Sequence, residues 1–206
     1  MRGLSRRGTL KVKDGRVQKK NNWEMTPNYY SHDQRELVID RQRPGEGYRH
    51  VLLQRDVETF ISLLPDWEEL SLGLNAIVLS PGENGTDGYH TPGVVHLCAW
   101  ETDLWRESSM EHYKSHRDIW DRLGVPCEEK DDDDGFGPYA LCKWTKETAR
   151  AYQLLHILTH ELGHHHDRIT TKSQKRTARG ESYAEAYARK YEALVWESFK
   201  KHFPLD

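Results

Sequence analysis

Two histidines and a glutamate form the part of this sequence best suited to chemistry. They lie in the segment His160-Glu161-Leu162-Gly163-His164. On a helix, residues four apart lie about one turn from each other, so both imidazoles can reach one cation. Glu161 projects close by, where its carboxylate can take a proton from a water molecule that the metal activates. Two neutral imidazoles and a carboxylate suit zinc, and a site that leaves one position to water is typical of catalysis.

The same pattern can arise by chance, because the chain has 12 histidines among 206 residues. A metal site is favoured because the segment belongs to an amphipathic helix, follows a predicted strand and has acidic residues downstream. A metzincin would carry Gly three residues and His or Asp six residues beyond the second histidine. The chain has Asp167 and Thr170 there, which excludes that class of zinc peptidase.

Residues 181–188 read Glu-Ser-Tyr-Ala-Glu-Ala-Tyr-Ala. Together with the histidine motif, this segment resembles the Glu-x-x-Ala-Asp-x-x-Ala helix of gluzincins, a family of zinc metallopeptidases, here in a minimal version. The resemblance implies that one Zn²⁺ per chain is bound by three side chains: His160, His164 and Glu181. It also implies that Glu161 is the general base and that Glu185 orients a zinc-binding histidine. Because the family usually has Asp at the position of Glu185, this residue stays open as the third ligand, although the motif favours Glu181.

The resemblance further implies an α+β, zincin-like fold, in which a small mixed sheet packs on the active-site helix and on a C-terminal helix that bears the glutamates. Periodicity alone predicts that a helix starts at Thr145 and continues past Leu158, and that another spans about 181–203. Further helices are predicted at 56–64 and 105–123, a loop at 127–137, and strands at 36–40, 48–53, 74–79, 93–100 and 139–144. In zincins an edge strand pairs with an extended peptide substrate, so residues 93–100 or 139–144 would be that edge.

Other side chains near the motif are candidates for supporting roles. The reaction needs a donor for the developing oxyanion, and the candidates are Tyr183, Tyr187, His165 and Arg179. Adjacent helical positions are about 100° apart, so His165 and His166 are expected to point away from the metal. His156 is expected to be packed or to support a ligand, and His90 and His96 are candidates for lining the cleft.

The composition fits one domain with a tail. The chain has 36% hydrophobic and 31% charged residues and a formal charge of −3, and its seven Trp and ten Tyr argue against full disorder. We expect a flexible basic arm at 1–22, with eight Lys and Arg against one Asp, and a single zincin-like domain at 23–206. No run approaches the roughly 20 apolar residues of a membrane span. Neither a signal peptide nor a disulfide spacing is apparent, so we expect a cytoplasmic protein with reduced cysteines and no membrane contact.

These observations predict a zinc metalloendopeptidase that acts on a peptide or protein substrate. The alternative is a non-catalytic, zincin-like metal-binding module that recruits nucleic acid or an acidic protein partner through the basic arm. In the enzyme, the same arm would make only weak nucleic-acid contact. A third possibility is a small structural protein whose histidines are incidental. The enzyme is favoured because a general-base glutamate has no purpose in a purely structural site.

Overall fold

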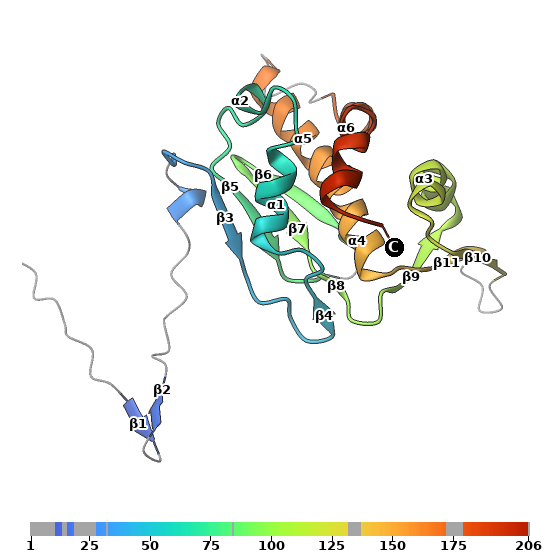
Figure 1. Cartoon of the computed structure of the whole chain (residues 1–206), viewed down its shortest axis with the longest axis horizontal. Coiled ribbons are helices and arrows are strands. Elements are labelled where there is room, and N and C mark those ends of the chain that lie inside the picture. Colours follow the sequence, from blue (N-terminus) through green and yellow to red (C-terminus); the bar gives the residue numbers. More distant parts are fainter. Residues whose placement is uncertain are drawn as a thin grey trace, which may run out of the picture.

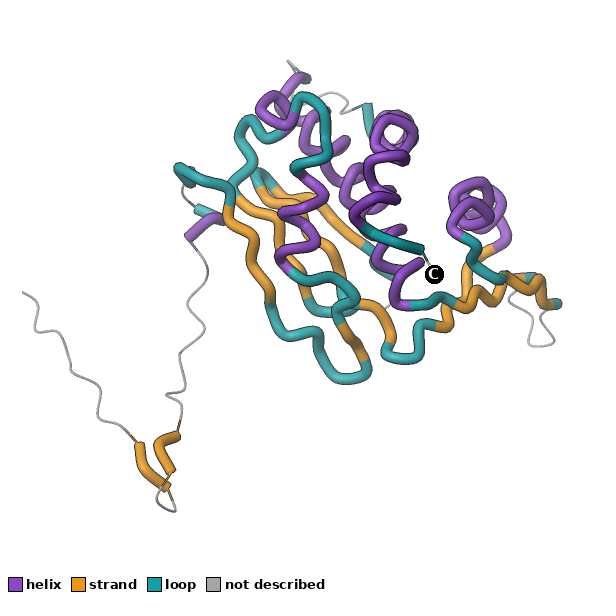
Figure 2. Tube along the Cα trace, viewed as in Figure 1, coloured by secondary structure: helices purple, strands orange, loops and turns teal. Residues whose placement is uncertain are grey.

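The computed structural model describes residues 28–31, 33–83, 85–131, 137–171 and 179–205, together with the backbone of 11–13 and 16–18. This part of the chain combines helices with small β-sheets (Figures 1 and 2). The α+β class expected from the sequence therefore agrees with the structure. Among the described residues, no helix combines the length and the apolar character needed to cross a membrane.

The main sheet has four strands in the order β3 (Val38–Arg41), β5 (Ala76–Ser80), β7 (Val94–Cys98), β6 (Gly88–Thr91). The first three are parallel to one another, and β6 is antiparallel to β7. β5 and β7 are buried along their whole length, which explains their nearly continuous apolar sequences. β6 is therefore an edge strand of this sheet.

Helices cover one face of this sheet. The core joins apolar side chains of β5 and β7 to those of α1 (Gln54–Ile61) and of the long helix that carries the histidine motif. That helix consists of α4 (Lys146–Tyr152), a π-helical segment (Gln153–Leu158) and α5 (Thr159–Thr170). The helix predicted to start at Thr145 and continue past Leu158 is confirmed. The Thr145 side chain accepts a hydrogen bond from the Thr148 backbone N–H at 3.1 Å and so caps α4.

The C-terminal helix α6 (Glu181–His202) packs along α5 (Figure 1). At Gly163 the two helices are so close that an added Cβ would lie 2.8 Å from the Cα of Ala184 and 3.0 Å from the Cβ of Tyr187. Only glycine fits between them at this distance. The middle of the histidine motif is therefore the place where the two helices that carry the predicted ligands meet.

A second, antiparallel sheet has the order β10 (Cys127–Lys130), β11 (Tyr139–Lys143), β9 (Trp105–Ser109), and β9 leads into α3 (Met110–Leu123). The helix predicted at 105–123 was wrong in its first five residues, because these pair with β11. The loop predicted at 127–137 was also wrong in part, since its first four residues form β10; residues 132–136 lie outside the described residues. Both errors arise because these residues become strands only by pairing with β11, which their own sequences do not indicate.

Cys127 and Cys142 face each other directly across β10 and β11 and form a disulfide, with their Cα atoms 4.1 Å apart. This corrects the expectation that all three cysteines are reduced; only Cys98 is free, and it is buried. The 15-residue separation of the pair matches no familiar disulfide pattern. The register of the two strands, which the cysteine spacing does not reveal, brings the sulfur atoms together.

The remaining elements are short. β4 (Tyr48–Arg49) pairs with β8 (Trp100–Glu101), and α2 (Trp67–Leu70) precedes β5. Within the basic segment 1–22, the described backbone forms two antiparallel strands, β1 (Lys11–Lys13) and β2 (Arg16–Gln18). The rest of the predicted arm lies outside the described residues.

Candidate metal centre

The structure brings the three predicted zinc ligands together. His160 and His164 come from α5, and Glu181 is the first residue of α6. The Nε2 atoms of the two histidines are 3.1 Å apart, and the Glu181 carboxylate lies 3.2 Å from Nε2 of His160 and 3.5 Å from Nε2 of His164. We call these three residues the His160 cluster. One nitrogen from each ring and one carboxylate oxygen thus converge on a common point.

The chemistry of these donor atoms suits a divalent cation. A neutral imidazole has one N–H donor and one acceptor nitrogen, and a carboxylate only accepts. Burial, followed by the nearby His160, lowers the pKa of His164, which keeps this ring in the neutral form that a metal requires. Two imidazole nitrogens and a carboxylate oxygen are also the donor set of many catalytic zinc sites.

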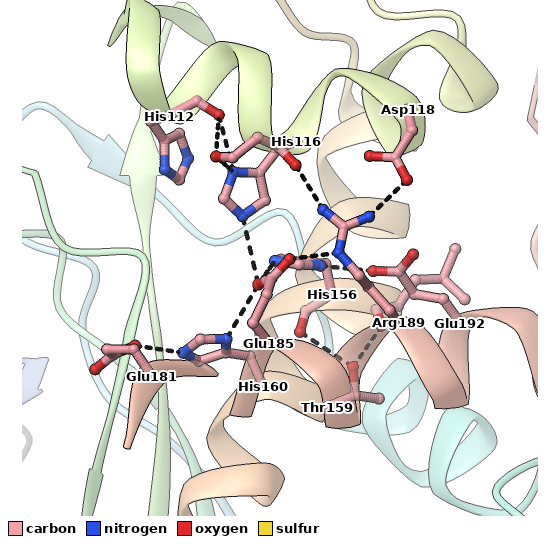
Figure 3. A network of polar contacts seen from close by, with 12 residues as sticks. His112, His116, Asp118, His156, Thr159, His160, Glu181, Glu185, Arg189 and Glu192 are labelled. Carbon is pink, nitrogen blue, oxygen red and sulfur yellow. Dashed lines mark hydrogen bonds and ion pairs between the residues drawn. The ribbon is translucent and has the colours of Figure 1, made fainter. Parts of the chain in front are cut away.

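Glu185 lies behind His160, on the side opposite to Glu181 (Figure 3). Its Oε2 atom is 3.6 Å from Nδ1 of His160, whereas Glu181 approaches Nε2 of the same ring. Its other oxygen accepts a hydrogen bond from Nε of Arg189 at 2.8 Å. Burial by itself raises the pKa of Glu185, but the contacts with His116, His156 and His160 hold it well below its usual range. Glu185 is therefore an anion beside the His160 ring.

Glu161 is almost completely buried, with 6% of its surface exposed. Burial raises the pKa of its carboxyl to about 7; Glu181 acts in the same direction, and His160 opposes the rise. Two hollows adjoin the His160 cluster, and together they form the cleft of this site. The Glu161 side chain lines both of them. A carboxyl group with a pKa near neutrality can both accept and release a proton.

The strand beside the motif helix is β6, and it lines both hollows together with Glu161. A Cβ at Gly88 would lie 2.7 Å from Cγ2 of Ile157 and 3.1 Å from Cγ of Glu161, so glycine lets this strand approach the helix. The predictions that residues 93–100 or 139–144 form the edge near the site are wrong. β7 lies between β5 and β6, and β11 lies in the middle of the other sheet.

A local signal for β6 was present but weak. Thr91-Pro92-Gly93 matches the sequence of a tight turn before β7, and Gly93 has a positive φ of 75°. The preceding residues are rich in Gly, Asn and Asp, which is typical of loops. The strand is recognisable only from its pairing with β7.

The other histidines near the motif point where expected, with one exception. His165 contacts the Leu72 carbonyl at 2.9 Å and His90 at 3.3 Å, and His166 contacts the Tyr183 hydroxyl at 2.7 Å. Both therefore point away from the His160 cluster. His90 lines the cleft as anticipated, but His96 is on the other side of the sheet, where its ring stacks on Tyr89 with 4.0 Å between ring centroids.

None of the four candidates for oxyanion stabilisation is among the residues that line the two hollows. His165 and Tyr183 are used in the contacts just described. Arg179 stacks on the Tyr183 ring at 3.7 Å, and Tyr187 is buried beside Tyr191. The lining residues that the sequence did not single out include His112 and Ser115 on α3, which became candidates only because α3 folds over the cleft.

Asp167 holds the start of α6 in place. Its carboxylate, buried with 1% exposure, accepts hydrogen bonds from Nε of Arg179 at 2.7 Å, the backbone N–H of Gly180 at 3.1 Å and the hydroxyl of Thr171 at 2.8 Å. Burial on its own would raise the pKa of Asp167, but these hydrogen bonds lower it. Because Gly180 directly precedes Glu181, the end of α5 positions the predicted third ligand.

Compared with protein-family models, with curated proteins and with solved structures, the chain shows no significant match to any of them. The resemblance to gluzincins therefore depends on the motif residues themselves.

Proposed function

We propose that this protein is a zinc-dependent metallopeptidase of gluzincin type with a zincin-like fold. The observation that carries the proposal is the convergence of His160, His164 and Glu181 next to a buried carboxyl, that of Glu161. The proposed fold is supported by the mixed four-stranded sheet, with an antiparallel edge strand beside the motif helix.

Each acidic residue has a distinct role in this proposal. Zinc bound by the His160 cluster would acidify a water molecule and polarise the peptide carbonyl. Glu161 takes the proton from the attacking water and passes it to the leaving amine nitrogen, so the peptide bond is replaced by a carboxylate and an amine. Glu185 lies 3.6 Å from Nδ1 of His160 and would orient the ring of the zinc-bound histidine from that side. This placement supports Glu181 as the ligand, because Glu181 faces the Nε2 atoms of both histidines.

An extended peptide fits the outer edge of β6. Among the described strands, β6 pairs only with β7. The N–H of Cys98 donates to the Asp87 carbonyl at 2.9 Å, so the backbone groups of Asp87 face β7. In an antiparallel pair, residues whose backbone groups face the partner strand alternate with residues whose backbone groups face away from it. The backbone groups of Gly88 and His90 consequently point away from β7, toward the cleft. They can form main-chain hydrogen bonds with a substrate, which supports a peptidase over a hydrolase of small molecules.

The test is Glu161→Gln, measured by hydrolysis of a fluorogenic peptide library and by zinc content from elemental mass spectrometry. We expect hydrolysis to fall by about 10²- to 10⁴-fold with zinc content unchanged, whereas His164→Ala loses activity together with one equivalent of zinc. Glu197→Gln, at an exposed position of α6, is the matched control and should behave as wild type. Undiminished hydrolysis by Glu161→Gln would refute the assigned role, and a wild-type protein that binds zinc but cleaves no peptide would favour the non-catalytic binding module.

A further inference from the structure

A second group of metal-binding side chains lies behind the His160 cluster. It consists of His116 on α3, His156 in the π-helical segment and Glu185 on α6, and we call it the His116 cluster. Oε2 of Glu185 is 3.4 Å from Nε2 of His156 and 3.7 Å from Nε2 of His116 (Figure 3). Three elements that are distant in the sequence thus place two imidazoles and a carboxylate around one point.

The outer nitrogens of both rings are already used as donors. Nδ1 of His156 lies 2.5 Å from a carboxylate oxygen of Glu192, and Nδ1 of His116 lies 2.9 Å from the backbone carbonyl of His112. Nδ1 of His116 also lies 2.9 Å from the Ser115 hydroxyl, whose hydrogen is donated to the same His112 carbonyl at 2.8 Å. The Glu192 carboxylate and the His112 carbonyl can only accept, so each Nδ1 carries a hydrogen. Burial lowers the pKa of His156, but its contacts with Glu185 and Glu192 outweigh burial and raise it to about 9. The Nε2 atoms of both rings are directed at the Glu185 carboxylate, so the second proton of His156 lies between its ring and Glu185, in the position that a metal ion would take.

A cation, either this proton or a metal ion, must lie between the two Nε2 atoms and the carboxylate. The arrangement of the rings matches that of metal-binding histidines, whose outer nitrogen typically donates to a carboxylate or a backbone carbonyl. Glu192 and the His112 carbonyl play these supporting parts here. The rings are 2% and 9% exposed, for His156 and His116, so packing also restricts their orientation.

The cluster is reachable from solvent. Its three residues line the hollow on the α3 side of the cleft, where Ser115 and Arg189 are neighbours. The Glu185 side chain is 29% exposed. An ion can therefore enter from the cleft and keep a position for water, although both rings are buried.

We propose that the His116 cluster is a second metal site that binds a divalent cation of the zinc, cobalt or nickel type through His116, His156 and Glu185. Two imidazoles and one carboxylate favour these borderline-soft ions, whereas magnesium and calcium prefer sites made of oxygen ligands. The site shares no ligand with the His160 cluster. Glu185 nevertheless lies between the two, because the same oxygen that would bind the second ion is 3.6 Å from Nδ1 of His160.

The experiment is a metal titration of the full chain after treatment with a chelator. Native mass spectrometry counts bound zinc, and the absorption of bound cobalt reports on ligand type. We expect two ions in the wild type, one in His116→Gln, one in His164→Gln and none in the double variant. His202→Gln, at an exposed position on α6, is the control for incidental binding to surface histidines and should retain both ions.

Two outcomes would overturn the proposal: a His164→Gln variant that binds no metal, or a His116→Gln variant that still binds two ions. In the first case the cation between the rings is the proton on His156; in the second case the additional ion is bound without His116. Circular dichroism of each variant shows whether it folds. Should His116→Gln fail to fold, the wild-type stoichiometry decides, because a single zinc ion bound at several equivalents of added metal also refutes a second site.

Discussion

A methyl group at Gly163 should disturb both the packing of α5 on α6 and the binding of zinc. The atoms nearest to the added carbon would be Cα of Ala184 at 2.8 Å and Cβ of Tyr187 at 3.0 Å. Neither is the end of a flexible side chain, so the contact cannot be relieved by a rotamer change. In Gly163→Ala the two helices must move apart, and with them the histidines of α5 and Glu181 of α6.

Two opposing effects determine the size of the change in stability. Alanine is better than glycine inside a helix by about 1 kcal/mol, whereas overpacking of a close contact costs about 1–3 kcal/mol. Because the atoms in the way belong to the backbone and to a Cβ, we expect the upper part of that range and a net loss of about 1–2 kcal/mol. For a chain of this length that corresponds to a fall in Tm of about 2–8 °C.

The loss of zinc affinity should be larger than the loss of stability suggests. Displacing Glu181 from the two histidines weakens coordination directly, and changes in the surroundings of zinc ligands typically cost about 10- to 100-fold in affinity. Urea denaturation of the zinc-free protein measures the loss of stability, and competition with a chromogenic chelator measures the loss of zinc affinity.

Gly124→Ala is the matched control. Gly124 ends α3 with a positive φ of 73° and has no atom within 4 Å of an added Cβ. Alanine there costs about 1 kcal/mol through backbone conformation alone and should leave the zinc affinity of the His160 cluster unchanged. The reasoning is refuted by a Gly163→Ala protein with wild-type stability and zinc affinity, or by equal losses of zinc affinity in the two variants.

Three further predictions concern other parts of the molecule. Burial lowers the pKa of His96 to about 4. Between pH 6.5 and 4 the His96 side chain is therefore protonated in the unfolded chain but not in the folded one. The free energy of unfolding should fall by up to about 3 kcal/mol over this range. His96→Leu should reduce that dependence in urea titrations across this range; an unchanged slope would contradict the assignment. Replacing Cys127 and Cys142 by serine removes a cross-link across 15 residues. The free energy of unfolding, measured by urea denaturation, should then fall by about 3 kcal/mol, and reduction of the wild type should lower it by the same amount. Asp167→Asn should lower zinc affinity about tenfold in chelator competition, since Asp167 positions the start of α6, whereas Asp121→Asn, at an exposed position of α3, should not.

The helices near the site were predictable because their signals are local. The Thr145 cap and the apolar stripe after it indicate a helix from a few neighbouring residues, and the structure confirms it. The helix predicted at about 181–203 is confirmed as α6 with nearly the same bounds. Capping, 3.6-residue periodicity and the distance between residues four apart all act within one or two turns, so they can be read without knowledge of the fold.

The strands near the site were harder to predict because pairing is not local. β6 looks like a loop until β7 pairs with it, and β9 looks like the start of a helix until β11 pairs with it. The disulfide shows the same dependence, since the register of β10 and β11 alone places Cys127 opposite Cys142. Such contacts depend on segments whose relative position is not encoded in either segment by itself.

The sequence by itself determined that two imidazoles lie one turn apart on a helix with a carboxylate between them, and that a glutamate-bearing helix follows. Only the tertiary structure decided which glutamate faces which nitrogen of His160, which strand borders the cleft, and that His116 reaches Glu185 from α3. The physical reason is the distance along the chain over which each interaction acts. Spacing along a helix is set by backbone geometry, whereas the approach of α3, α5 and α6 is set by the packing of their side chains, as at Gly163.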